Sequence, residues 1–255
     1  MAKVKRRSWD RYSARQAAQR KAAANEMMAF AHEAAAGKAS AATIARNGSR
    51  IAVKHGRSSA ALACAWYERV AAEAGVEIAK ATPVVVSNVG RIAVQVNKAM
   101  PLLDVGDVDG FAKACARAVE SEVKRSASRT MRNNAKRDGA EYAWVPQGAE
   151  TCAFCITLAS NGWQTASSKT ARGEHEDHIH PNCECEFAVR FDKSSGVEGY
   201  DPGYYENKYE GATGKNSNDK INSLRRSMYA NDEEYKMKIQ EQHRDRYAAL
   251  HPSDD

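Results

Sequence analysis

Aromatic side chains are scarce in this chain, and long apolar runs are missing. Phe, Trp and Tyr together make up 7% of the residues. No apolar run approaches the roughly 20 residues that a membrane-spanning helix needs. The basic start, Met1 to Arg7, is not followed by the apolar core of a secretory signal. We therefore expect a protein that is made and folded in a cytosol, has no membrane partner and does not rely on disulfide bonds.

The 255 residues are enough for one large domain or two small ones, each with its own hydrophobic core. Hydrophobic residues make up 43% and charged residues 27% of the chain, which is typical of a globular protein. Alanine is frequent in the first half and favours helices with short side chains.

The net charge of +6 is concentrated in two basic stretches, Lys3 to Lys21 and Lys113 to Arg137. This asymmetry indicates an acidic neighbour such as nucleic acid. A single charged run is more often a solvated helix face, and a second run shifts that balance only in part. Contacts to phosphates would not depend on base sequence and would weaken as salt rises. The residues expected to make non-specific DNA contacts are Lys3, Lys5, Arg6, Arg7, Arg125, Arg129 and Arg132.

Residues 8 to about 100 have the spacing of a helical array. The first apolar stripe starts after a cap at Ser8–Asp10 and ends at Gly37. A second helix is expected over Ser40–Val53, because Gly56 and the serines that follow it interrupt the pattern.

Apolar residues at every fourth position predict a third helix. A further helix, the fourth, is expected to start at Pro83 and end before Pro101. The β-branched run Val84–Val86 leaves a strand as the alternative there. The positions that mark the third helix are Leu62, Trp66, Val70 and Ala74.

A long helix is predicted from about 108 to 136, with a cap at Asp107–Asp109 and an end at Asp138–Gly139. Its basic residues are expected to face outward. The positions expected to face inward are Phe111, Cys115, Val119, Val123 and Met131.

After residue 140 the pattern changes from helices to short mixed elements. Tyr142–Pro146 and Glu186–Phe191 predict strands, and Thr151–Ser160 predicts a short helix between them. Beyond Gly196 we expect surface loops and then two charged helices, over 218–229 and 232–250. The predicted fold is therefore α+β. It has a mostly helical N-terminal region with a basic arm (1–106), a module formed by the long helix and a zinc-stapled Cys/His knot (107–195), and a loop-rich and helical C-terminal tail (196–255).

Four of the six cysteines lie between residues 152 and 185, in Cys152-Ala-Phe-Cys155 and in His178-Ile-His180-Pro-Asn-Cys183-Glu-Cys185. A gap of two residues suits two ligands of one tetrahedral zinc ion, and the second segment repeats that gap. The sequence therefore predicts a Zn2+ site, and which four donors bind the metal is left open. The predicted ligands are Cys152, Cys155, His180, Cys183 and Cys185, with His178 as a further candidate.

A structural role is the first interpretation of this site. A complete set of protein ligands leaves no open position on the metal for water or substrate. Cys152 and Cys155 on the first turn of a helix aim their sulfurs at one point, and Cys183 and Cys185 share one side of an extended segment. Zinc would then staple the long loop between the two pairs. Cys64 and Cys115 lie on apolar helix faces and are expected to be structural thiols.

Three enzymatic interpretations compete with the structural one. A zinc deaminase needs His-x-Glu first and Pro-Cys-x-x-Cys later, which is not the order here. A thioredoxin-like redox pair needs a βαβ context, which the neighbourhood of Cys152 does not supply. A metal-dependent nuclease of the HNH kind would use His178 as its general base, yet the next histidine after Cys185 is His243. The nuclease is kept as the alternative function.

The paired cysteine motif resembles that of the phage Mu F-like (MuF) minor head proteins, also called head morphogenesis proteins. The similarity covers about residues 120 to 191 and includes Glu150-Thr151 before the first pair and His180-Pro181-Asn182-Cys183 in the second. The usual arginine between the last two cysteines is Glu184 here, which keeps the metal ligands and removes a basic contact.

This resemblance implies a non-enzymatic minor capsid protein of a tailed bacteriophage. Such a protein would assemble in the cytoplasm of the host bacterium and reside inside the virion head, with the portal and major capsid proteins as partners. The zinc-like residues carried over from the family motif are Cys152, Cys155, His180, Cys183 and Cys185. A secreted effector that borrows the same module is a weaker idea, because the chain shows no signal or toxin segment.

Overall fold

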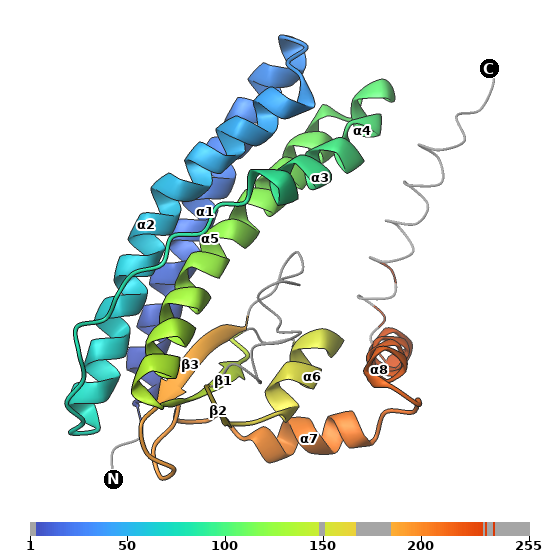
Figure 1. Ribbon diagram of the computed structural model, residues 1–255. Coiled ribbons are helices and arrows are strands. Elements are labelled where there is room, and N and C mark those ends of the chain that lie inside the picture. Colours follow the sequence, from blue (N-terminus) through green and yellow to red (C-terminus); the bar gives the residue numbers. More distant parts are fainter. Residues whose placement is uncertain (1–3, 148–150, 167–184, 232, 234–236, 238–255) are drawn as a thin grey trace.

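The computed structural model describes residues 4–147, 151–166, 185–231, 233 and 237 of the chain. Three long helices, α1 (Arg6–Ala36), α2 (Ala41–Glu73) and α5 (Val108–Asp138), pack side by side along most of their length (Figure 1). A small antiparallel sheet lies at one end of this bundle, and shorter helices lie beside the sheet. The predicted α+β fold is therefore confirmed.

The described part of the chain contains no helix with both the length and the apolarity to cross a bilayer. Two large clusters of buried side chains form the hydrophobic core, and each takes residues from both sides of position 106. The expected division into three regions stays a prediction.

Helix α2 runs without interruption through Gly56, so the predicted break at this position is wrong. Gly56 lies where α2 crosses α5, and a Cβ atom there would come within 2.8 Å of the Ser126 hydroxyl. The glycine therefore permits close helix packing, which outweighs its low helix propensity of about 1 kcal/mol. Ser59 is buried as well, and its hydroxyl donates to Oε1 of Gln16 on α1 at 2.5 Å.

The fourth predicted helix starts later than the sequence indicates. Residues 76–88, here called the strap, have no regular secondary structure and run along the bundle before α3 (Val89–Ala99) and α4 (Pro101–Asp104). Asn88 caps α3, because its side-chain oxygen accepts a hydrogen bond from the Arg91 amide at 3.0 Å. Both the helix from Pro83 and the strand at Val84–Val86 are therefore wrong for this segment.

The strap is held by a row of polar side chains on α5 rather than by a neighbouring strand. Every second strap amide, from residue 82 to residue 88, donates to a side chain of α5 at 2.9 Å. Four residues of an α-helix rise about 6 Å, which is close to the roughly 6.6 Å that two extended residues span. Every second residue of the strap therefore lies opposite every fourth residue of α5. The pairs, antiparallel in direction, are Thr82–Asn134, Val84–Thr130, Val86–Ser126 and Asn88–Glu122.

Loss of one such pair should be measurable as a change in the free energy of unfolding. Thr130 is fully buried, and its hydroxyl oxygen accepts from the Val84 amide at 2.9 Å. The hydroxyl proton faces two carbonyl oxygens, that of Ser126 at 2.7 Å and that of Val84 at 3.3 Å. Thr130→Val keeps the shape and leaves the Val84 amide without its acceptor, so we expect a loss of about 1–3 kcal/mol in urea unfolding. Ser128→Ala is the matched control, because the Ser128 hydroxyl bonds only to carbonyls of its own helix. Equal losses in the two variants would contradict this role of the row.

Helix α5 confirms most of the prediction made for it. Asp107 caps its first turn by accepting from the Gly110 amide at 2.8 Å, and Gly139 ends it in the left-handed conformation with φ 68°. All five positions expected to face inward are fully buried.

The expectation that the basic residues of α5 face outward is wrong in the middle of the helix. The exposed fraction is 3% for Lys124 and 5% for Arg125, whereas Lys113 and Arg117 are exposed. Arg125 donates to Oε1 of Glu122 at 2.7 Å. Other elements cover α5 on more than one side. The side of the helix opposite its apolar stripe is therefore not fully exposed to solvent.

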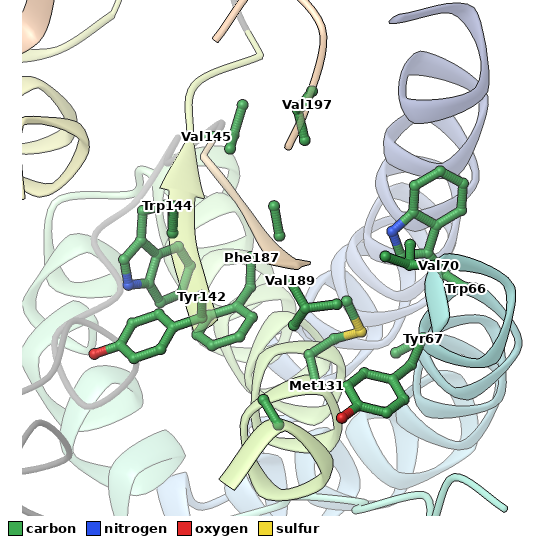
Figure 2. Close-up of a cluster of buried hydrophobic side chains, with 14 of the residues drawn as sticks. Trp66, Tyr67, Val70, Met131, Tyr142, Trp144, Val145, Phe187, Val189 and Val197 are labelled. Atoms are coloured by element: carbon green, nitrogen blue, oxygen red, sulfur yellow. The ribbon is translucent and has the colours of Figure 1, made fainter. Parts of the chain in front are cut away.

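The sheet consists of β1 (Glu141–Val145), β2 (Gln164–Thr165) and β3 (Glu186–Arg190) in the order β2-β1-β3. The two predicted strands are confirmed as β1 and β3, with Trp144 opposite Phe187. Phe187 stacks on Tyr142, with ring centroids 4.8 Å apart, and meets Trp144 edge to face. Figure 2 shows these rings beside Met131 of α5, in the core that joins the sheet to the bundle.

The start of the described chain lies against the segment that follows β3. Val4 pairs in parallel with Val197, and its amide donates to the Gly196 carbonyl oxygen at 2.9 Å. Both valines are buried. The segment before α1 is therefore fixed to a segment that follows β3, which ties the start of the bundle to the sheet.

Three short helices complete the structure. Helix α6 (Ala153–Ser160) confirms the short helix predicted between the strands, and α8 (Ser217–Asn231) confirms the first tail helix. Helix α7 (Pro202–Glu210) lies where surface loops were expected; Pro202 starts it and Asp201 caps it by accepting from the Gly203 amide. Helices α7 and α8 pack on α6 around a small apolar cluster. Most of the second predicted tail helix, 232–250, lies outside the described residues.

Candidate metal centre

The first cysteine pair lies at the N-terminus of α6. Cys152 is the residue that caps the helix, and its sulfur accepts a hydrogen bond from the Cys155 amide at 3.4 Å. Cys155 is on the first turn and is 3% exposed. An amide that donates to sulfur, together with the positive end of the helix dipole, stabilises a thiolate, which is the form of cysteine that binds zinc.

Cys185 precedes β3 directly and is fully buried. Cys155 and Cys185 belong to the same core cluster, and Cys152 packs against it. None of these three cysteines forms a disulfide. The tertiary structure therefore brings one thiol-bearing segment before α6 and another before β3 into one core, although they lie far apart in the sequence.

The remaining predicted donors, His178, His180 and Cys183, lie outside the described residues. Within the residues that the structure describes, no three His, Cys, Asp or Glu side chains form a group that could hold a metal ion. The zinc site and its ligand set therefore stay predictions. The described thiols suit zinc in chemistry, because zinc takes cysteine sulfur as a ligand and the Cys152 sulfur accepts an amide hydrogen bond at the N-terminus of α6.

Charged and aromatic groups surround the cysteine-bearing end of β3. Glu186 follows Cys185, is 3% exposed and accepts from the guanidinium of Arg20 on α1 at 2.5 Å. Tyr200 donates through its hydroxyl to the Ala159 carbonyl oxygen of α6 at 2.8 Å. Burial raises the pKa of Tyr200, and the nearby Tyr205 and Cys185 raise it further. Tyr200 therefore packs against the core cluster that contains Cys185, and it contacts α6.

The other two cysteines differ from this group, as the sequence predicts. Burial alone raises the pKa of the Cys115 thiol to about 12, and Cys115 is fully enclosed in the helical core. Burial is also the main cause of the raised pKa of Cys64, followed by the carboxylate of Glu68. Both groups are therefore held in the neutral thiol form, which is a poor metal ligand.

The structure changes which basic residues are accessible to DNA. Arg125 is buried and paired with Glu122, and Arg129 and Arg132 are only partly exposed. In the arm, Lys5 and Arg7 are exposed, whereas Arg6 is partly exposed and pairs with Asp10 at 2.8 Å. Lys3 lies outside the described residues. Arg125 is therefore withdrawn from the expected phosphate contacts.

Residues 3–212 match the family model described as VG15 protein. This chain belongs to the VG15 protein family. The family is viral, which supports a phage origin for this chain. The match covers the whole bundle, the sheet and α6 and α7, and ends before α8. No curated protein and no solved structure matches the chain. The VG15 match does not address the resemblance to MuF proteins.

Sequence reasoning missed several residues that organise this VG15 family member. The polar row on α5 is visible in the sequence as a polar residue at every fourth position. Only the apolar stripe beside it was interpreted, because apolar periodicity is the stronger signal of a helix. The partly buried pair Arg20–Glu186 joins residues 166 positions apart, and no local pattern indicates it. The members of the polar row are Glu122, Ser126, Thr130 and Asn134.

Proposed function

We propose that this VG15 family member is a structural, non-enzymatic minor capsid protein of a tailed bacteriophage. It would act in head morphogenesis, beside the portal and the major capsid protein, inside a virion head that assembles in the host cytoplasm. The observation that carries the proposal is the match to a viral family over residues 3–212. The MuF-like spacing of the cysteine and histidine residues supports the finer assignment.

The zinc staple is part of this proposal. Cys152, Cys155 and Cys185 would supply thiolates, and His180 and Cys183 are the other candidate ligands. A bound zinc ion would cross-link the start of α6 to the start of β3 and supply folding free energy rather than catalysis. The burial of Cys155 and Cys185 in one core supports a closed site of this kind.

DNA contact is proposed through the basic arm. Lys5 and Arg7 are exposed at the start of α1, and their contacts would go to phosphates without reading bases. The nuclease alternative depends on His178, which lies outside the described residues, and the VG15 match does not favour it. We therefore propose no second function.

The proposal is tested in virions of the phage that encodes this chain. We expect mass spectrometry of purified, DNA-filled heads to detect the protein at far fewer copies than the major capsid protein. Deletion of its gene should reduce the yield of infectious particles, and a plasmid-borne copy should restore it. Absence of the protein from purified heads would contradict the assignment. So would magnesium- or manganese-dependent plasmid cleavage that the His178→Ala variant lacks.

A further inference from the structure

The outer face of α2 carries only basic and small side chains along its N-terminal two-thirds. Arg46, Arg50, Lys54 and Arg57 are all exposed there. At about 100° per residue they fall within an arc of about 80°, and they extend over about 17 Å of the helix. These four residues are here called the α2 basic face.

No acidic residue occurs between residues 34 and 67, so this part of α2 lacks the acidic residues, spaced four positions from basic ones, that neutralise an ordinary solvated helix. Lys54 is the exception, because its ammonium group pairs with Glu26 of α1 at 2.7 Å. Arg46 donates to the hydroxyl of Thr43. Within the described structure no carboxylate pairs with Arg46, Arg50 or Arg57. Three guanidinium groups thus share one rigid face without compensating charge.

The composition of this face favours a nucleic acid over a protein partner. Protein interfaces have an apolar and aromatic centre, and none of the large hydrophobic side chains found exposed in the described residues lies on α2. Single-stranded nucleic acid is held by aromatic stacking, which this face does not offer. The other exposed positions nearby are Ala42, Ser58, Ala61 and Ala65, which are small enough for a smooth surface to approach.

We infer that the α2 basic face binds the phosphate backbone of duplex DNA without reading its sequence. Duplex DNA carries one charge per about 1.7 Å of its axis with both strands counted, so a stretch of about 17 Å holds roughly ten phosphate charges, more than enough to pair with three guanidinium groups. This inference rests on the proposed function in one respect, the presence of packaged DNA next to the protein. It adds a second contact surface that is independent of the basic arm.

The test compares two triple variants of the full chain by fluorescence anisotropy with a labelled duplex of about 20 base pairs, at several salt concentrations. Arg46→Ala, Arg50→Ala and Arg57→Ala remove three charges from the α2 basic face. The matched control, Lys215→Ala with Arg225→Ala and Arg226→Ala, removes three exposed charges near and on α8. Both variants keep the arm, and thermal melting followed by circular dichroism verifies that both are folded.

Each phosphate contact contributes about 0.9 to the slope of log affinity against log salt. We expect the α2 variant to bind at least about 10-fold more weakly at about 100 mM salt, with a slope smaller by about 2–3. The control variant should bind like the unmodified protein. Equal affinity and slope in the two variants would overturn the inference, and so would polyglutamate competing as well as duplex of equal charge. Either failure leaves the presence of the protein in virions to be decided by its own test.

Discussion

Replacement of Glu122 by alanine is expected to destabilise the protein by about 3–5 kcal/mol, as removal of one partner from a buried charge pair does. Glu122 is 1% exposed and accepts hydrogen bonds from three groups. These are the Asn88 amide at 2.9 Å, Nε of Arg91 at 3.0 Å and Nη1 of Arg125 at 2.7 Å. One carboxylate therefore joins the strap, the first turn of α3 and a buried cation of its own helix.

The effect should be local as well as global. Without Glu122 the Asn88 amide loses its acceptor, and Arg91 loses the contact that holds the start of α3 on α5. Hydrogen exchange is expected to quicken at residues 82–91 at denaturant concentrations below global unfolding, because this segment depends on side chains of α5 rather than on a sheet.

Glu120→Ala is the matched control, two residues away on the same helix. Burial raises the pKa of Glu120, so this carboxylate gains little from its surroundings. Its replacement should cost less than about 1 kcal/mol. Equal destabilisation by the Glu120 and Glu122 variants would show that charge on α5, rather than the contacts of Glu122, determines the loss.

Removal of zinc is expected to have the second large effect. Structural zinc binding is worth on the order of 10 kcal/mol in small metal-dependent domains, and that free energy is coupled to folding. If zinc closes the module, elemental analysis will find one ion per chain. A strong chelator will then lower the melting temperature and expose thiols that the native protein protects.

Variants of single cysteines distinguish loss of a metal ligand from loss of a buried side chain. Cys155→Ser and Cys185→Ser should lose the zinc. Cys64→Ala and Cys115→Ala should keep one ion per chain, even though the cavity left at the fully buried Cys115 will lower stability. The zinc-to-protein ratio is thus a readout that does not depend on stability. A metal-free wild-type protein, or melting that a chelator leaves unchanged, would contradict the staple.

Local sequence signals were sufficient for the elements whose ends and periodicity are both marked. The long helix α5 was predictable within two residues, because Asp107 and Gly139 mark its ends and its apolar residues recur at helical spacing. Strands β1 and β3 and helix α6 followed from changes of pattern around Tyr142, Cys152 and Glu186. The spacing of Cys152 and Cys155 also predicted two thiols at the start of a helix, and α6 confirms that position.

Packing between distant segments determined the structure wherever it conflicts with local signals. Gly56 is a helix breaker by propensity, yet it is the residue that lets α2 approach Ser126 of α5. Lys124 and Arg125 look like solvent-facing residues, but neighbouring elements bury them. The sequence of the strap favours a helix or a strand, yet the strap is neither, because its amides bond to side chains of α5 that lie 40 and 46 residues away for Val86 and Val84. Such pairings depend on contacts between distant segments, which no short window of sequence contains.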